Sequence, residues 1–286
     1  MKHVKPILAI GLTIGIVAII CQPLPLNTGA GADGDSKSTQ QLVSDTASDI
    51  TADAVSVCII DSGCNPDGVP GKNYLTDETT DLTDATGHGT AIYQILSKAA
   101  PDAQIYMLKC FENAEELPST ATVIINAIYD AVDVYHADII NMSWTLNTES
   151  EELHEALKYA YDKGVVLVAA AGNLSLSTPL GSIVYPAGWD EVIGVAGTDT
   201  GEDGEPATST WYLHSEAVFV SADGNYQEDK GSSYAAPRVS GILANYLSEQ
   251  KNASPTLEDA KEYLKSIAVD AGDPGYDTTF GWGVVG

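Results

Sequence analysis

Short apolar runs alternate with helical patterns through most of the chain. The runs lie at residues 54–60, 105–108, 138–142, 165–170 and 192–196, and almost every position in them is apolar. A run without polar alternation is typical of a strand that is covered on both faces, as in a parallel sheet. The pattern therefore predicts buried strands rather than strands with one solvent-facing side.

Helical periodicity separates these runs. Residues 120–135 and 151–163 place apolar side chains three or four positions apart. For the second helix we expect Thr148 and Glu151 as a capping pair and Gly164 as the stop, and a late helix begins at Ser254-Pro255. Strand–helix alternation predicts an α/β fold with three layers: a mostly parallel central sheet with helices on both faces.

The N-terminal 32 residues have a different character. Two lysines and no acid precede or flank an apolar run at residues 7–21, which is the layout of an export signal and is short for a membrane span of about 20 residues. Three alternatives remain: a cleaved signal ending near Ala30-Gly31-Ala32, a retained anchor that tethers the chain to a membrane through residues 7–21, or lipidation at Cys21. Each places the body of the protein outside the cytoplasm.

The remaining chain divides at residue 54. Residues 33–53 are polar and rich in Gly, Ser, Thr and Asp, so they indicate a linker or a short pro-segment. Residues 54–286 form one domain, with no internal repeat and no phosphate-binding glycine motif. The chain carries 40 acidic against 13 basic residues, a net charge of −27. Such a surface repels polyanions, which argues against a nucleic-acid partner and against an anionic membrane surface.

Four short segments hold the residues that can carry chemistry. They are Asp61-Ser62-Gly63, residues 87–90 with His88, residues 170–173 with Asn173, and residues 231–237 with Ser233. A serine hydroxyl needs a base to become a nucleophile, imidazole has a suitable pKa, and a carboxylate orients the imidazole. An amide and a helix N-terminal N–H can stabilise an oxyanion. We interpret Asp61, His88, Ser233 and Asn173 as the catalytic set.

These motifs resemble those of the subtilisin-like serine proteases, over residues 54–286. The order Asp, His, Ser is that family's order, and the segment Gly231-Ser232-Ser233 matches its serine motif, with Ser232 where threonine is usual. The resemblance implies the subtilisin-like fold and an exported, monomeric endopeptidase that cleaves proteins or peptides through an acyl-enzyme. Because Ser233 holds the register of the motif, we expect Ser232→Ala to have little effect.

The resemblance also implies two walls of a substrate pocket. Residues 140–143 form one wall and residues 170–172 the other, so Ser143, Trp144, Ala171 and Gly172 are the predicted substrate-binding residues. Subtilisins place small residues after the serine, and the bulk of Trp144 is expected to narrow the cleft. The chain passes directly from the helix after His88 into the next strand, so the loop that binds calcium in subtilisins is missing. We therefore expect no metal and no cofactor.

Several interpretations stay open on the sequence alone. Asp84 either braces the histidine loop or is a solvated charge. Cys64 and Cys110 follow neighbouring strands and form either a disulfide or two buried thiols, and Cys58 is a core residue. Two other functions compete with the protease: a catalytically inert subtilase-fold binding module at the cell surface, and an esterase-type hydrolase, which the missing Gly-x-Ser-x-Gly motif disfavours.

Overall fold

A computed structural model describes residues 54–112, 121–201, 204–208, 211–250 and 255–286. The predicted export signal or anchor at residues 1–32 and the linker or pro-segment at residues 33–53 lie outside these residues. No helix of the described part combines the length and the apolar character that a membrane span requires.

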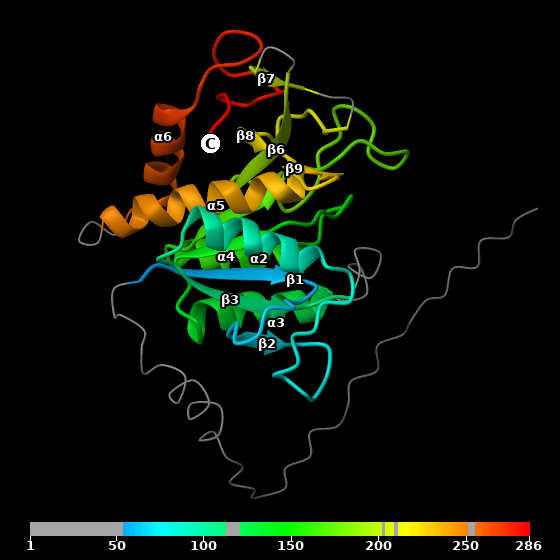
Figure 1. Ribbon diagram of the computed structural model, residues 1–286, viewed down its shortest axis with the longest axis vertical. Coiled ribbons are helices and arrows are strands. Elements are labelled where there is room, and N and C mark those ends of the chain that lie inside the picture. Colours follow the sequence, from blue (N-terminus) through cyan, green and yellow to red (C-terminus); the bar gives the residue numbers. More distant parts are fainter. Residues whose placement is uncertain (1–53, 113–120, 202–203, 209–210, 251–254) are drawn as a thin grey trace, which may run out of the picture. The chain divides into compact units, whose positions relative to one another are not determined.

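A mostly parallel sheet runs through the described part of the chain (Figure 1). Its strand order is β2-β3-β1-β4-β5-β6-β7, and β8 also pairs with β6. Every pair in this sheet is parallel except β6 with β7. The strands are β1 Ser56–Asp61, β2 Gly71–Asn73, β3 Gln104–Lys109, β4 Ile139–Met142, β5 Val166–Ala170, β6 Val192–Thr200, β7 Pro206–Ala207 and β8 Val220–Asp223.

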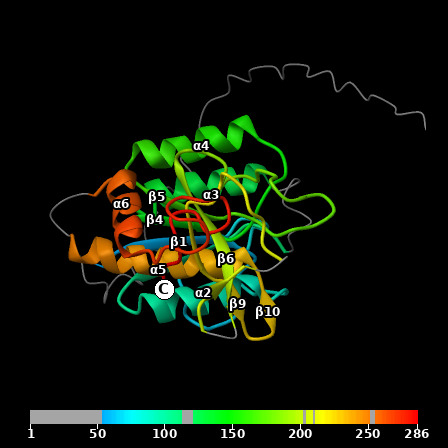
Figure 2. The same cartoon turned by 90° about the horizontal axis from the view of Figure 1, so that it is seen from above.

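Helices cover both faces of the sheet, as Figure 2 shows from above. Side chains of α3 and α4 pack in the core cluster on one face, and side chains of α2, α5 and α6 pack in the cluster on the other. The predicted three-layer α/β fold is thereby confirmed. The helices are α2 His88–Ala99, α3 Ala121–Asp133, α4 Glu151–Asp162, α5 Ser232–Glu249 and α6 Leu257–Ile267.

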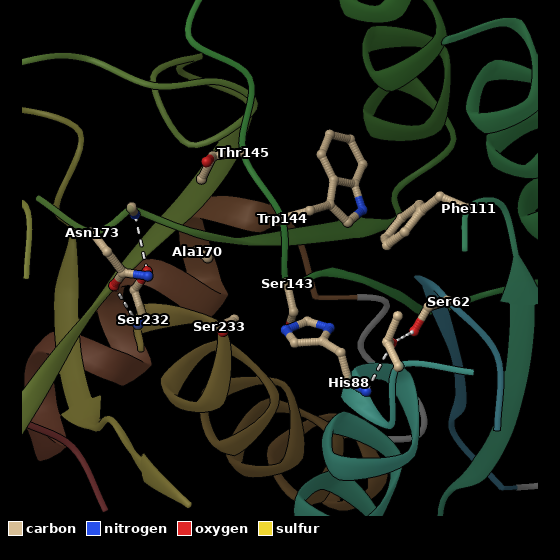
Figure 3. Close-up of a pocket in the computed structure, with 12 residues that line it drawn as sticks. Ser62, His88, Phe111, Ser143, Trp144, Thr145, Ala170, Asn173, Ser232 and Ser233 are labelled. Atoms are coloured by element: carbon tan, nitrogen blue, oxygen red, sulfur yellow. Dashed lines mark hydrogen bonds between the residues drawn. The ribbon is translucent and has the colours of Figure 1, made fainter. Parts of the chain in front are cut away.

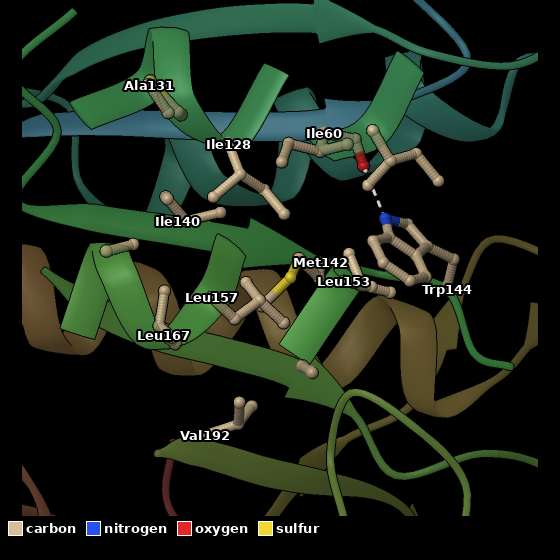
Figure 4. Packing of buried hydrophobic residues seen from close by; sticks show 14 of the residues in the cluster. Ile60, Ile128, Ala131, Ile140, Met142, Trp144, Leu153, Leu157, Leu167 and Val192 are labelled. Atoms are coloured by element: carbon tan, nitrogen blue, oxygen red, sulfur yellow. Dashed lines mark hydrogen bonds between the residues drawn. The ribbon is translucent and has the colours of Figure 1, made fainter. Parts of the chain in front are cut away.

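The strands supply the centre of both clusters. In β1, Cys58 and Ile60 face α3 and α4, whereas Val57 and Ile59 face α2 and α5. All six residues of β1 are buried, which is the reason why its sequence shows no polar alternation. Figure 4 shows the first cluster, where Ile60 and neighbouring strand residues pack against α3 and α4.

Two helix starts differ from the prediction. Helix α4 is capped by Ser150, whose hydroxyl accepts the N–H of Leu153, and not by Thr148. Helix α6 begins after Thr256, which forms a capping box with Asp259, so the predicted start at Ser254-Pro255 is two residues early. In both cases a Ser or Thr closer to the apolar face satisfies the free N–H groups. The stop at Gly164 is confirmed, because this residue adopts φ 87° directly after the helix.

A small hairpin and the C-terminal segment complete the domain. Strands β9 (Asn225–Tyr226) and β10 (Asp229–Lys230) pair antiparallel and lead directly into α5. After α6, the chain returns to the sheet edge through bridges between Val220 and Gly281 and between Ser221 and Val284. The last described residues therefore close the edge of the sheet beside β8.

The cysteines of the described residues are all free and buried. Cys110 packs with α3 and α4, whereas Cys64 packs in the opposite cluster with α2 and α5. Of the two alternatives, the structure has two thiols rather than the disulfide, because the sheet lies between the two side chains. Burial, together with Asp84 and Asp61, raises the pKa of the Cys64 thiol to about 12, so this thiol stays protonated near neutral pH.

Candidate active site

The candidate residues meet at the carboxyl ends of the parallel strands. Asp61 ends β1, Ser143 follows β4, and Asn173 follows β5, while His88 opens α2 and Ser233 is the second residue of α5. These ends surround a cavity of about 400 Å³ (Figure 3), in which the His88 imidazole points from α2 toward α5. The cavity is lined by Ser62, Thr86, His88, Phe111, Ser143, Trp144, Thr145, Ala170, Gly172, Asn173, Ser232 and Ser233.

Asp61 contacts the His88 imidazole and is not itself a lining residue of the cavity. Its Oδ1 lies 2.8 Å from His88 Nδ1 and also accepts the N–H of Ser62 at 2.8 Å. The carboxylate is completely buried, and its Oδ2 has no hydrogen-bond partner among the described residues. Burial alone would lower the pKa of His88. The charge and hydrogen bond of Asp61, with the charge of Asp84, outweigh burial and raise that pKa above its ordinary value.

Asp84 organises the loop that leads into His88. It is 5% exposed, and its Oδ1 accepts hydrogen bonds from the Ser62 hydroxyl, from the N–H and hydroxyl of Thr86, and from the N–H of Gly87. Its Oδ2 accepts from the N–H and the hydroxyl of Thr90 at 2.8 and 2.7 Å. Asp84 is therefore a buried brace between the Asp61 turn and the first turn of α2, and not a solvated charge.

Two backbone carbonyls of the same loop accept hydrogen bonds from residues near the ends of β1 and β3. The N–H of Cys64 donates to the carbonyl of Leu82 at 2.7 Å, and the ammonium of Lys109 donates to the carbonyl of Thr83. Lys109 is 4% exposed, although its charge also pairs with Glu112 at 3.0 Å. A buried ammonium is stable only with such partners. Lys109, at the end of β3, thus anchors the loop beside Asp61, its register neighbour in β1.

The glycine after His88 allows the close approach of α2 to the Asp61 turn. A Cβ at Gly89 would lie 2.3 Å from the carbonyl oxygen of Gly63 and 3.1 Å from Asp61 Oδ1. Any side chain here would push the helix away and stretch the contact between His88 and Asp61. The His-Gly pair is therefore a geometric requirement of this arrangement.

Asn173 is oriented by the start of α5. Its Oδ1 accepts the N–H of Ser232 at 3.0 Å, so its Nδ2 is the atom left to face the cavity. A Cβ built on Gly231 would lie 3.0 Å from Ser233 Oγ and 3.4 Å from Asn173 Nδ2. The serine hydroxyl and the asparagine amide therefore border the same small space. The N–H of Ser233 lies in the first helical turn, where it has no partner within the helix.

Ser232 connects α5 to the strand that carries Asn173. Its buried hydroxyl accepts the N–H of Gly172 at 3.0 Å. Gly172 itself has φ 98°, a backbone conformation that favours glycine. The hydroxyl at position 232 therefore has a structural role. The expectation that Ser232→Ala has little effect did not include this hydrogen bond. Ser233 and His88 border the same cavity without a direct hydrogen bond, as is common without substrate.

The predicted substrate-binding residues divide into two groups. Ser143 and Gly172 line the cavity, and Ser143 Oγ accepts from Asn141 Nδ2 at 3.0 Å. Ala171 is completely buried in the cluster with α3 and α4 and does not line the cavity. Trp144 borders the cavity, but its indole is 4% exposed in the core and donates to the carbonyl of Ile60 at 3.0 Å. Most of the Trp144 side chain therefore lies in the core, and narrowing of the cleft by its bulk stays a prediction.

Other cavity residues were missed by the sequence analysis. Phe111 follows β3 and lies at a strand end that faces the site, whereas Ala170, which ends β5 and also lines the cavity, belongs to the predicted wall at residues 170–172. The strand order would have pointed to Phe111, because β3 is the neighbour of β1. Ser62 stands next to Asp61 and bonds to both Asp61 and Asp84. No sequence signal distinguishes Thr86 or Thr145 from ordinary loop residues.

The connection between α2 and β3 does not fit the calcium-binding loop that subtilisins have at this place. Between α2 and β3 the chain has only residues 100–103, and these close with short turns. No group of three or more His, Cys, Asp or Glu side chains in the described part is arranged to hold a metal ion. This connection is too short for a loop that wraps a cation with several oxygens.

Two curated proteases match most of this chain in sequence. The chain is 28% identical over 261 residues to the minor extracellular protease Epr of Bacillus subtilis (strain 168), covering 82% of this chain and 38% of Epr. It is 30% identical over 242 residues to subtilisin DY of Bacillus licheniformis, covering 78% of this chain and 86% of that protein.

A structural comparison supports the fold, and a family comparison gives the family. The solved structure of fervidolysin from Fervidobacterium pennivorans, a keratinolytic enzyme related to subtilisin, superposes with a TM-score of 0.69 at 24% identity, covering 86% of this chain and 43% of that one. The model of the Subtilase family matches residues 52–283. The chain therefore belongs to the Subtilase family of serine endopeptidases.

Proposed function

We propose that this chain is an exported serine endopeptidase that hydrolyses peptide bonds in proteins or peptides through an acyl-enzyme. The observation that carries the proposal is the convergence of Ser233, His88 and Asn173 on one cavity, with His88 bonded to a buried Asp61 at 2.8 Å. Family membership supports the reaction class. The basic and apolar pattern of residues 1–32 supports export, and the name of Epr describes an extracellular relative.

Each residue has a distinct role in the proposed reaction. His88 takes the hydroxyl proton as Ser233 Oγ bonds to the scissile carbonyl carbon, and Asp61 stabilises the imidazolium that forms. Asn173 Nδ2 and the N–H of Ser233 stabilise the oxyanion. The carbon–nitrogen bond then breaks, and His88 returns the proton to the leaving amine. Water hydrolyses the ester on Ser233 by the same steps, and no metal or cofactor takes part.

Covalent labelling tests the nucleophile directly. A serine-reactive phosphonate is expected to label the full chain at Ser233, and Ser233→Ala abolishes both labelling and peptide hydrolysis. Ser232→Ala is the matched control, because it removes the adjacent hydroxyl and leaves the nucleophile in place. Labelling that survives in Ser233→Ala would contradict the assignment. A folded chain that neither reacts with the phosphonate nor cleaves a denatured protein would instead support the inert binding module.

The amide of Asn173 gives a second test. Removing one oxyanion donor typically lowers kcat by about 10²–10³, so Asn173→Ala is expected to retain labelling and lose most of its kcat. Unchanged kcat would exclude Asn173 as an oxyanion donor.

A further inference from the structure

Two stacked tyrosines, one of them beside the proposed catalytic pair, have no role in the triad. Tyr234 directly follows Ser233 in α5, and its ring centroid lies 5.9 Å from that of His88 at an interplanar angle of 43°. Tyr226 of β9 stacks on Tyr234 with centroids 5.5 Å apart and an angle of 26°. Both side chains are only partly buried, so their rings are accessible from solvent.

Tyr234 borders the catalytic pair from outside the cavity, and Tyr226 extends this aromatic surface by stacking on Tyr234. Neither lines the cavity that Ser143, Gly172 and Asn173 help to form, although Tyr234 contacts His88 and adjoins Ser233 in sequence. The cavity therefore suits the acyl part of a substrate. The leaving amine must lie near His88, because the imidazole protonates it. The residue that follows the scissile bond is thereby placed next to the Tyr234 ring.

The aromatic pair is held in position before any substrate binds. Arg238 of α5 donates from Nε to the carbonyl of Asp223 at 2.9 Å and from a terminal nitrogen to that of Asn225 at 2.8 Å, which fixes the hairpin against the helix. The Tyr226 hydroxyl bonds to Gln94 of α2, the helix that carries His88. Figure 2 shows this hairpin beside α2 and α5. A rigid aromatic surface binds with a small entropic cost.

We propose that Tyr234 and Tyr226 form a subsite for an aromatic or large apolar residue immediately after the scissile bond. This inference rests on the proposed function and adds a preference on the leaving-group side of the cleavage site. Aromatic rings that meet in tilted or offset geometry attract each other beyond the area they bury. Asp229 of the hairpin places a negative charge near Tyr234, so an acidic residue is disfavoured there.

Acyl transfer from a simple ester substrate measures this subsite separately from the acyl side. The ester acylates Ser233, and water then competes with an added amino acid amide for the acyl-enzyme. When the amine attacks, a carbon–nitrogen bond forms, the bond to Ser233 Oγ breaks, and the amine proton passes through His88 to Ser233. The attacking amine occupies the place of the leaving amine, because aminolysis is the reverse of acylation.

The ratio of aminolysis to hydrolysis is compared for phenylalanine amide, glycine amide and aspartic acid α-amide. Because both products come from one acyl-enzyme, the ratio does not depend on the acylation rate. We expect phenylalanine amide to exceed glycine amide by about threefold or more, and aspartic acid α-amide to fall below glycine amide. Equal ratios for phenylalanine and glycine amides, or a preference for glycine amide, would overturn the subsite.

Variants locate the preference on the tyrosines. Tyr234→Ala is expected to bring the phenylalanine-to-glycine ratio close to one, Tyr234→Phe retains it, and Tyr226→Ala, which leaves the catalytic helix intact, loses part of it. Tyr246→Ala is the matched control, because Tyr246 lies on the same helix and stacks on Tyr263 at 4.1 Å. A wild-type ratio in both Tyr234→Ala and Tyr226→Ala refutes the proposal.

The outcome for the proposed function is separate. Ester hydrolysis without amide selectivity refutes only the subsite. A wild-type chain that does not hydrolyse the ester refutes the proposed function, and the subsite with it.

Discussion

Replacing Asp84 by asparagine tests whether the buried brace sets the chemistry of His88. The substitution keeps the shape of the side chain and removes its charge. One amide oxygen can still accept from Ser62, Thr86 and Gly87, as Oδ1 does in the wild type. The amide nitrogen takes the place of Oδ2, which in the wild type accepts the N–H of Thr90 at 2.8 Å. The N–H of Thr90 thereby loses its acceptor.

The structure gives the size of the stability change. A hydrogen bond to a charged acceptor is lost, and a backbone donor of α2 is left without a partner, so we expect the free energy of unfolding to fall by about 2–4 kcal/mol. Burial alone would raise the pKa of the Asp84 carboxyl, but the hydrogen bonds from Thr90, Ser62 and Thr86 outweigh burial and lower it. The stabilisation that ionised Asp84 contributes is complete above the ordinary pKa of an aspartate. It is lost as pH falls through the lowered pKa of Asp84. The difference between wild type and Asp84→Asn therefore shrinks in acid.

The pH dependence of activity gives a readout that a purely structural role would not move. In the proposed mechanism the neutral imidazole is the active base, so kcat/KM is expected to rise with pH through the pKa of His88, which lies above its ordinary value of about 6.5. Asp84 is one of the charges that raise this pKa. Asp84→Asn is thus expected to shift the acidic limb to lower pH.

Urea unfolding and the pH profile of kcat/KM with a peptide substrate measure the two effects. Asp81→Asn is the matched control, because it removes an exposed charge of the same loop. If the acidic limbs of Asp84→Asn and wild type coincide, Asp84 does not act on His88, and the electrostatic reasoning is wrong.

Three further predictions follow from other contacts of the site. Ser232→Ala leaves the N–H of Gly172 without its acceptor and is expected to lower the free energy of unfolding by about 1–3 kcal/mol in urea, while Ser232→Thr retains the wild-type value; equal stability of all three would remove the structural role of the hydroxyl. Trp144→Phe leaves the buried carbonyl of Ile60 without a donor and lowers the same free energy by about 1–3 kcal/mol, and an unchanged urea midpoint would contradict this. EDTA is expected to change neither kcat/KM nor the thermal midpoint, and a loss that calcium restores would reveal a cation site.

The layers of the fold and the main site residues were accessible from the sequence for a physical reason. Buried parallel strands such as 56–61 are apolar on both sides, and their carboxyl ends share one edge, so Asp61 and Asn173 could be placed together. Cap residues were less accessible, because Thr148 and Ser150 offer similar side chains and only the position of the buried helix face selects between them.

Side-chain direction could not be predicted for residues next to the site. Ala171 lies in a segment that borders the cavity, yet its side chain packs in the cluster with α3 and α4, and Trp144 borders the cavity while most of its side chain packs in the same cluster. The role of Lys109 depends on a carbonyl of a distant loop, which no local pattern identifies. Such contacts are set by tertiary structure and not by the neighbouring sequence.

The wide separation of Ser233 from Asp61 and His88 along the chain has a consequence for how the site forms. Asp61 and His88 are translated before α5, and α5 must pack against β4, β5, β6 and β8 before its first turn is in place. Until α5 has packed, the proposed acid and base lack the proposed nucleophile. The proposed site is therefore completed by long-range packing of the folded domain and not by any local segment of the chain.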